Sequence, residues 1–235
     1  MFQMIAFDAD DTLWHNETRY AKAKEDFGEL LTTYQSAEKA KQFLDQIEVR
    51  NIELYGYGMK SFTLSMIEAA IELSDGKISG NELRSILDLA RTVLNAEVEL
   101  FPRVQETIAG LAKYYPLLLI TKGDASEQER KIQRSGLEPY FQAVEIVHDK
   151  TLSTYRSVIQ KYHLTPELFV MVGNSLRSDI FPVVKLGGIA VHIPQESTWF
   201  HENMVEGDLD DKDYYQIEHI GQLPDLLETI KKKLI

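Results

Sequence analysis

The chain reads MIAFDADDT at residues 4–12, where a short apolar run passes directly into acidic residues. An apolar run of this length, bounded by turn-forming residues, predicts a buried strand of a parallel sheet. Open α/β sheets carry their functional residues at the carboxyl ends of the strands. Asp8 and Asp10 follow this strand at once, so the two carboxylates can converge on one reacting group there.

The second half of the chain repeats this strand pattern. From residue 100 onward, apolar runs alternate with segments of helical periodicity, which predicts a parallel sheet with helices on both faces. The carboxyl ends of parallel strands lie at the same edge of the sheet. Three polar elements follow these runs: Thr121, Lys150 and the GNSLRSD segment at residues 173–179. The apolar runs lie at residues 117–120, 143–147, 168–172 and 189–193, and the expected helices of this half lie at residues 104–113, 126–136, 151–162, 178–186 and 222–234.

The intervening residues carry helical periodicity and almost no strand signal. Apolar residues recur there at three- and four-residue spacing, which predicts an all-helical insert after the first strand. We therefore expect a discontinuous catalytic core formed by residues 1–14 and 98–235, and a helical domain formed by residues 15–97. The expected helices of the insert lie at residues 20–34, 37–49, 61–73 and 81–94.

Composition narrows the functional classes. The net charge of −12 argues against a nucleic-acid partner, although a bound cation and local lysines can still admit an anionic substrate. The chain has no cysteine, which leaves oxygen ligands for any metal and excludes disulfides. No apolar run reaches the roughly 20 residues that span a bilayer, and the first residues do not resemble a secretory signal. We expect a cytoplasmic protein without a membrane partner.

The four motifs resemble those of the haloacid dehalogenase-like hydrolase superfamily, and the resemblance covers the whole chain. Residues 8–12 look like the first motif, Thr121 like the second, Lys150 like the third and residues 173–179 like the fourth. The helical insert is similar to the C1-type cap of that superfamily. The resemblance implies a Rossmann-like core with a helical cap, dependence on Mg²⁺, and phosphate-ester hydrolysis through an aspartyl-phosphate.

Residue chemistry is consistent with this reaction. A carboxylate is anionic at neutral pH and can attack phosphorus, so Asp8 is the expected nucleophile. An alkoxide leaving group needs a proton and the second step needs a base, and one carboxyl group, Asp10, can serve both. We expect Asp11 to be a turn or capping residue and Thr12 to shape the loop by bonding backbone amides.

The other polar elements carry groups that bind a phosphoryl group. The Thr121 hydroxyl and the backbone N–H groups of Lys122 and Gly123 are expected to hold its oxygens ahead of a helix. Lys150 is expected to place its ammonium group between Asp8 and the phosphate. Lys122 competes for that role less strongly, because it lies beside the expected phosphate-binding turn. The segment after Lys150 departs from the pattern of the superfamily, since it lacks the prolines that are common there.

The resemblance also implies a metal site formed by Asp8, Asp10, Asn174 and Asp179. The fourth motif commonly begins Gly-Asp, but this chain has Asn174 at that position. An amide oxygen can ligate Mg²⁺ without contributing charge. Either Asn174 or Asp179 can therefore be the inner-sphere ligand.

These observations favour a magnesium-dependent phosphatase that acts on a small soluble phosphate monoester. A phosphomutase of the β-phosphoglucomutase type would use the same acids. A dehalogenase is less favoured, because Asp10 supplies a proton that halide departure does not need. A receiver-type phosphorylation switch is also less favoured, because its phosphorylated Asp would not lie on the first strand under a cap.

Overall fold

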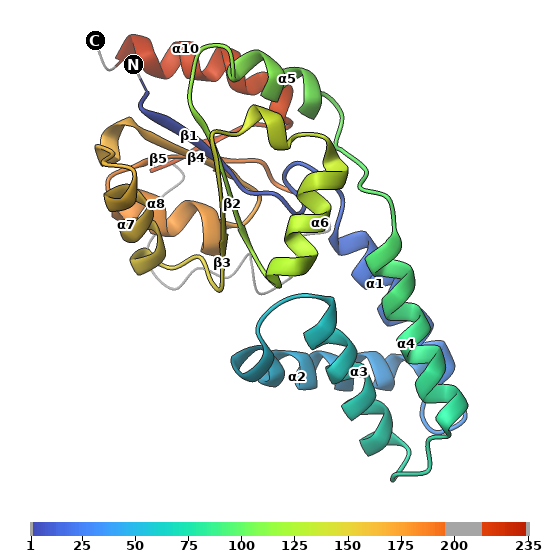
Figure 1. Ribbon diagram of the computed structural model, residues 1–235. Coiled ribbons are helices and arrows are strands. Elements are labelled where there is room, and N and C mark those ends of the chain that lie inside the picture. Colours follow the sequence, from blue (N-terminus) through green and yellow to red (C-terminus); the bar gives the residue numbers. More distant parts are fainter. Residues whose placement is uncertain (1, 196–212, 234–235) are drawn as a thin grey trace. The chain divides into compact units, whose positions relative to one another are not determined.

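The structure, a computed structural model, describes residues 2–195 and 213–233 (Figure 1). Its six-stranded sheet has the order β3-β2-β1-β4-β5-β6, and every neighbouring pair is parallel. This sheet, covered by helices, confirms the predicted α/β class. The strands are β1 (Met4–Phe7), β2 (Leu117–Lys122), β3 (Ala143–Val147), β4 (Phe169–Gly173), β5 (Ile189–His192) and β6 (Tyr215–Gln216).

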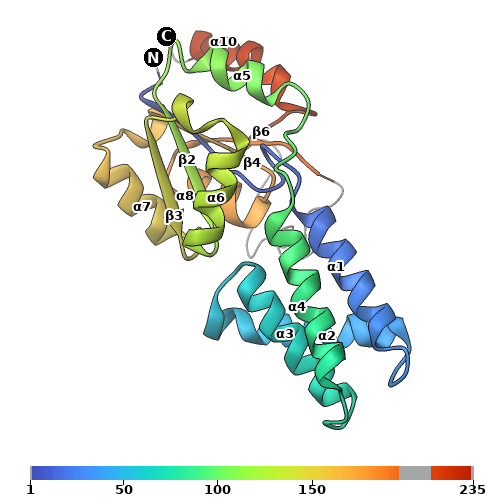
Figure 2. The same cartoon turned by 45° about the vertical axis from the view of Figure 1, so that its right-hand side comes forward.

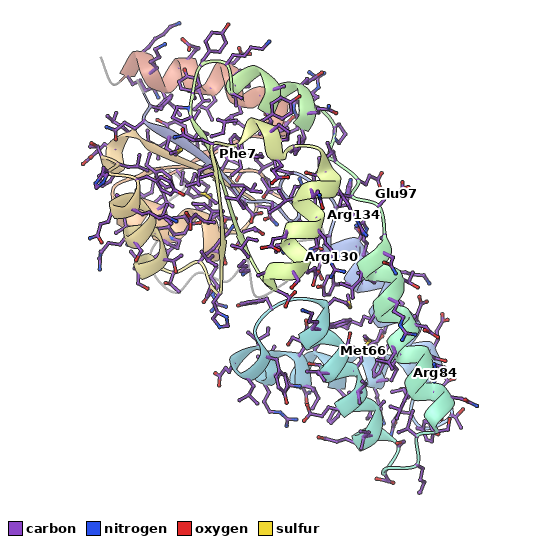
Figure 3. The ribbon with its side chains drawn as sticks, viewed as in Figure 1. Phe7, Met66, Arg84, Glu97, Arg130 and Arg134 are labelled. Carbon is purple, nitrogen blue, oxygen red and sulfur yellow. The ribbon has the colours of Figure 1, made fainter. Side chains whose placement is uncertain are left out.

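The side chains of the strands alternate between two hydrophobic cores, one on each face of the sheet. In β1, Ile5 and Phe7 belong to one core, whereas Met4 and Ala6 belong to the other. Figure 3 shows Phe7 within the first core. Burial on both faces explains why the strands read as continuous apolar runs.

Helices cover both faces of the sheet (Figures 1 and 2). Side chains of α5, α6 and α10 pack in the core that contains Phe7, and side chains of α7 and α8 pack in the core that contains Met4. These helices are α5 (Val104–Leu111), α6 (Ala125–Ser135), α7 (Leu152–Lys161), α8 (Phe181–Lys185) and α10 (Leu223–Lys233).

Strand β1 lies at the centre of the sheet, between β2 and β4. Phe7 is in register with Leu119 of β2 and with Val172 of β4. The Asp8 backbone N–H continues this ladder and donates to the Val172 carbonyl at 2.9 Å. The residues that follow β1, β2 and β4 therefore meet at one edge of the sheet.

The loop after β1 turns tightly and runs into the first helix. The Ala9 carbonyl accepts from the Leu13 N–H at 2.8 Å. Asp11 has a positive φ of 59°, and its carboxylate accepts from the backbone N–H groups of Asn16 and Glu17. Asp11 thus has the turn and capping role expected for it.

The chain leaves and re-enters the sheet unit through a short paired segment. Trp14 forms an isolated antiparallel bridge with Leu100. Beside it, the His15 N–H donates to the Glu99 carbonyl at 3.0 Å. The two ends of the helical insert are therefore held together by backbone hydrogen bonds.

The chain divides into two compact units. The sheet unit comprises Met1–Glu17, Val98–Lys122 and Glu129–Ile235, and the helical unit comprises Thr18–Glu97 and Gly123–Gln128. Among the described residues, none of the helices is long and apolar enough to cross a membrane.

The helical unit has its own hydrophobic core, in which Phe27, Leu44 and Met66 are fully buried. Figure 3 labels Met66 in this unit. Two of its helices begin with a serine cap: Ser36 precedes α2, and Ser79 forms a capping box ahead of α4. The helices are α1 (Glu17–Leu30), α2 (Ala37–Tyr55), α3 (Met59–Leu73) and α4 (Gly80–Asn95).

Two elements differ from the sequence-based expectation. The sequence predicts one helix over residues 178–186, but the structure has a π-helical turn, η3 (Leu176–Ile180), followed by the short helix α8. Pro182 lacks the N–H that would continue a single α-helical ladder. The sequence does not predict β6, because two residues are too few to show an alternating pattern.

Gly173 ends β4 directly against the π-helical turn. A Cβ atom added at Gly173 would lie 2.2 Å from Oδ2 of Asp179. Real Cβ contacts are never this short, so only glycine allows the Asp179 carboxylate to fold back onto the strand end.

Gly173→Ala should therefore destabilise the fold by about 1–3 kcal/mol, because the added methyl group overpacks a buried site. Gly110→Ala is the control: a Cβ there meets nothing within 4 Å, and removing a helical glycine should stabilise by roughly 0.5–1 kcal/mol. Urea unfolding followed by circular dichroism measures both. Equal stability of Gly173→Ala and wild type would contradict the close approach.

Helix α2 places Glu48 in a partly buried position. Burial, followed by the nearby charge of Asp45, raises the pKa of Glu48 to about 7, although Lys24 opposes the shift. Between about pH 4.5 and pH 7 the folded chain then binds more protons at this site than the unfolded chain does, so the Glu48 contribution to stability falls as the pH rises.

Glu48→Gln should remove this pH dependence and raise the thermal unfolding midpoint at pH 8 more than at pH 5. Midpoints of wild type and variant at both pH values test this. Glu53→Gln, at an exposed position of the same helix, is the matched control. A Glu48→Gln shift of the same size at both pH values would argue against a raised pKa.

Candidate active site

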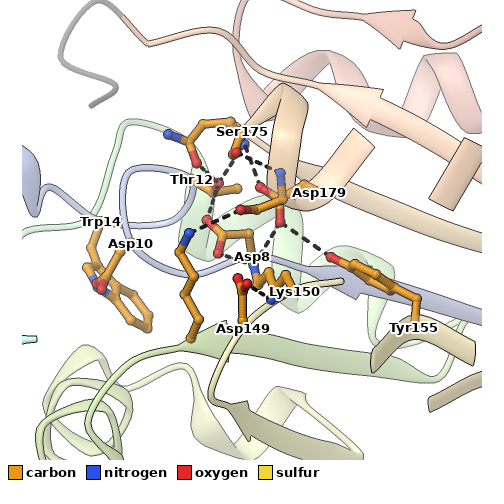
Figure 4. Close-up of polar contacts among 12 residues, drawn as sticks. Asp8, Asp10, Thr12, Trp14, Asp149, Lys150, Tyr155, Ser175 and Asp179 are labelled. Atoms are coloured by element: carbon orange, nitrogen blue, oxygen red, sulfur yellow. Dashed lines mark hydrogen bonds and ion pairs between the residues drawn. The ribbon is translucent and has the colours of Figure 1, made fainter. Parts of the chain in front are cut away.

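A buried lysine joins two carboxylates at the carboxyl edge of the sheet (Figure 4). The Lys150 ammonium contacts Oδ1 of Asp8 and lies 2.7 Å from Oδ1 of Asp179. The side chains of Lys150 and Asp179 are each 1% exposed, and that of Asp8 is 9% exposed. Buried charges are tolerated only when they are paired, so these three groups stabilise one another.

The ion pairs of Lys150 set the protonation states of Lys150 and Asp8. Burial raises the pKa of the Asp8 carboxyl to about 7, with the Lys150 ammonium opposing the shift. Burial lowers the pKa of Lys150, but the charges of Asp179 and Asp8 outweigh burial, so the pKa of Lys150 lies above its ordinary value. Lys150 therefore stays protonated and favours the anionic form of Asp8.

Thr12 connects the loop after β1 to the loop after β4. Its hydroxyl donates to Oδ2 of Asp8 at 2.7 Å and accepts from the Asn174 backbone N–H at 3.0 Å. The Asn174 side-chain oxygen lies 3.3 Å from the same hydroxyl. Asp8, Thr12 and Asn174 thus form one buried cluster of oxygen atoms.

The π-helical turn after β4 holds Asp179 in place. Oδ2 of Asp179 accepts from the Ser175 backbone N–H at 3.1 Å, and the Tyr155 hydroxyl lies 3.5 Å from Oδ1. The Ser175 hydroxyl in turn accepts from the Ser178 backbone N–H at 2.9 Å. Both oxygens of Asp179 are therefore bonded within the protein.

Asp10 does not join the cluster around Lys150. Its carboxylate accepts from Nε1 of Trp14 at 2.6 Å and contacts the Lys131 ammonium at 2.9 Å. Figure 4 shows Asp10 beside the Trp14 indole and Asp8 beside Lys150. The first motif thus separates its two acids into different hydrogen-bonded environments.

The predicted phosphate-binding residues lie at the end of β2. Thr121 is buried, with 1% exposure, in a strand that continues through Lys122. The Lys122 ammonium donates to the Ser178 hydroxyl at 3.0 Å, whereas Lys150 contacts Asp8. Gly123 has a φ of +133°, a conformation that favours glycine.

The donor chemistry of the site fits a hard cation such as Mg²⁺. A carboxylate of Asp8 and the amide oxygen of Asn174 are linked through the Thr12 hydroxyl, and all are oxygen atoms. Among the residues that the structure describes, no three His, Cys, Asp or Glu side chains form a metal cluster. The Asp10 side chain instead faces Trp14 and Lys131.

Sequence reasoning missed four residues of the site: Trp14, Lys131, Tyr155 and His192. Nε2 of His192 donates to the Asn174 carbonyl at 3.0 Å, and burial lowers the pKa of His192, which favours the neutral ring. The position of His192 at the end of β5, in register with Gly173, is a feature from which its place near the site could have been predicted. Trp14, Lys131 and Tyr155 lie in apolar or helical segments that carry no comparable signal.

The profile of the haloacid dehalogenase-like hydrolases matches residues 2–182. The chain is 29% identical over 139 residues to a glyceraldehyde 3-phosphate phosphatase of Pyrococcus furiosus, a match that covers 56% of this chain and 55% of that protein. The chain thus spans about half of that relative.

Two further relatives match over nearly the whole chain. A human N-acylneuraminate-9-phosphatase is 24% identical over 242 residues, covering 98% of this chain and 95% of that protein. A crystal structure of a haloacid dehalogenase-like family hydrolase from Xanthomonas campestris has a TM-score of 0.87 and 36% identity, covering 99% of this chain and 93% of that chain. The chain therefore belongs to the haloacid dehalogenase-like hydrolase family.

Proposed function

We propose that the chain is a magnesium-dependent phosphatase that hydrolyses a small phosphate monoester through an aspartyl-phosphate. The buried ion pair between Lys150 and Asp8 carries this proposal. It favours the anionic form of the Asp8 carboxylate at the end of the central strand, against the opposing effect of burial, and the anion is the form that attacks phosphorus. The names of two relatives, phosphatases of glyceraldehyde 3-phosphate and of an N-acylneuraminate 9-phosphate, favour a small organic phosphate.

In the first step, an Asp8 oxygen attacks phosphorus while Asp10 donates a proton to the departing alkoxide. In the second step, Asp10 takes a proton from water, which then cleaves the acyl phosphate. Thr121 and the N–H groups of Lys122 and Gly123 bind the phosphoryl oxygens. The Lys150 charge offsets the negative charge that develops beside Asp8.

Mg²⁺ would be held by Asp8 and Asn174, and it would supply charge to orient the phosphoryl group. We assign the inner-sphere position to Asn174 because its amide oxygen shares the Thr12 hydroxyl with Asp8, whereas Asp179 bonds to Lys150 and to the Ser175 N–H. Asp179 then acts mainly by holding Lys150.

We further propose that the chemistry belongs to the core formed by residues 1–14 and 98–235, and that residues 15–97 select the substrate. All groups assigned to the reaction lie at the carboxyl end of β2 or in the segments that follow β1, β2, β3 and β4. Residues 18–97 of the helical unit form an independent hydrophobic core and contribute none of these groups. Such a division lets substrate choice vary while the reacting groups stay fixed.

The two acids can be tested separately. Asp8→Asn should abolish turnover, because an amide cannot form the acyl phosphate. Asp10→Asn should lower kcat/KM for an alkyl phosphate by roughly 10²- to 10⁴-fold, and much less for p-nitrophenyl phosphate, whose leaving group needs little protonation. Phosphate release measures both, with Asp225→Asn at an exposed site as the control. Full activity of Asp8→Asn would refute the mechanism.

Metal binding gives an independent test. EDTA should stop turnover and Mg²⁺ should restore it. Asn174→Asp adds a negative charge to the proposed ligand, so Mg²⁺ should bind about tenfold more tightly, a gain of about 1.4 kcal/mol. Isothermal titration calorimetry measures this without turnover. Unchanged affinity in Asn174→Asp, together with a large loss of affinity in Asp179→Asn, would assign the ion to Asp179 instead.

A further inference from the structure

A lysine from α6 contacts the carboxylate that the proposed mechanism uses as acid and base. The Lys131 ammonium lies 3.1 Å from Oδ1 and 2.9 Å from Oδ2 of Asp10. It also donates to the side-chain oxygen of Asn16 at 2.8 Å. The Lys131 and Asp10 side chains are 15% and 20% exposed, so the pair is largely shielded from water.

Trp14 holds the same carboxylate from the other side. Its indole N–H donates to Oδ1 of Asp10 at 2.6 Å, and its ring is fully buried (Figure 4). The Trp14 carbonyl accepts from the Asp11 backbone N–H at 2.8 Å, which closes the loop between them. The Trp14 ring therefore cannot turn away from Asp10 without disturbing the buried core.

Lys131 is itself anchored. The next residue, Ile132, packs in the hydrophobic core that contains Phe7, which fixes the rotation of α6 about its axis. A Lys side chain has considerable rotational freedom, and three hydrogen bonds to Asp10 and Asn16 restrict it here. The ammonium thus links a core-packed helix to the loop that carries Asp10.

We infer that Lys131 is a positioning residue for Asp10. It fixes the carboxylate that acts as acid and base, and it links this carboxylate to Asn16, the residue that precedes α1. The inference rests on the proposed function, because it assigns Lys131 a role through Asp10. A general acid must be held close to its productive position, and a displacement of about 1 Å can cost roughly 10²-fold in rate. A short Asp side chain on a loop needs such support.

The test is the leaving-group dependence of Lys131→Met. Its kcat/KM should fall about 10- to 100-fold for an alkyl phosphate and less than about threefold for p-nitrophenyl phosphate, because only the alkoxide needs the proton from Asp10. Lys131→Arg keeps the charge and should recover most of the alkyl phosphate activity. Asn16→Ala removes one partner of Lys131 and should give a smaller loss with the same substrate preference.

A double-mutant cycle gives the sharpest readout. Once Asp10 is Asn, removing Lys131 should cost nothing further with the alkyl phosphate, because both changes disable one group. Lys161→Met is the charge control: it also removes one ammonium group from the sheet unit, and its side chain is 60% exposed. It should leave the ratio of the two substrates unchanged.

Each outcome is decisive. Equal losses on both substrates, or additive losses in the double mutant, would reduce Lys131 to a structural role and overturn the inference. If Lys131→Met does not fold, an unchanged substrate ratio in Asn16→Ala would overturn it. Wild-type chain that releases no phosphate, or an active Asp8→Asn variant, would reject the proposed function instead.

Discussion

The buried ammonium group of Lys150 is the constraint on which the site depends. Its side chain is only 1% exposed, so two carboxylates must reach it, one from the loop after β1 and one from the turn after β4. The central place of β1 in the sheet makes this possible, because the ends of the flanking strands lie within side-chain reach. The same requirement explains the residue choices around it: a glycine at 173 leaves room for Asp179, and Thr12 satisfies the second oxygen of Asp8.

The two acids of the first motif have opposite surroundings although they are two residues apart. Asp8 is enclosed with Lys150 and the Thr12 hydroxyl, which suits a group that must stay anionic and attack. Asp10 lies between an indole N–H and a lysine that belongs to a different helix. Division of labour between neighbouring carboxylates thus arises from which element each one faces, because the tight turn after β1 gives the two side chains different directions.

Much of this architecture could be predicted from sequence because it follows local rules. Strands buried on both faces read as apolar runs, and parallel strands share one carboxyl edge, so the sequence alone predicts that Asp8, Lys150 and Asp179 lie together. The contacts of Lys131 could not, because α6 is rich in charged residues and its sequence does not show which of them faces the loop after β1. The break before α8 also escaped prediction, because the π-helical turn depends on how Asp179 packs against Gly173.

The paired exit and return of the chain has a consequence for how this architecture can change. Trp14 bridges Leu100, and His15 bonds Glu99, so the sheet unit already brings together the two points between which the helices are inserted. When the sheet unit already holds the two ends of an insertion together, closing the inserted loop costs little additional entropy, and this cost grows only slowly with the length of the insertion. The sheet unit therefore provides a fixed insertion point. A shorter, longer or unrelated domain could be inserted there while the loop that carries Asp8 and Asp10 keeps its conformation.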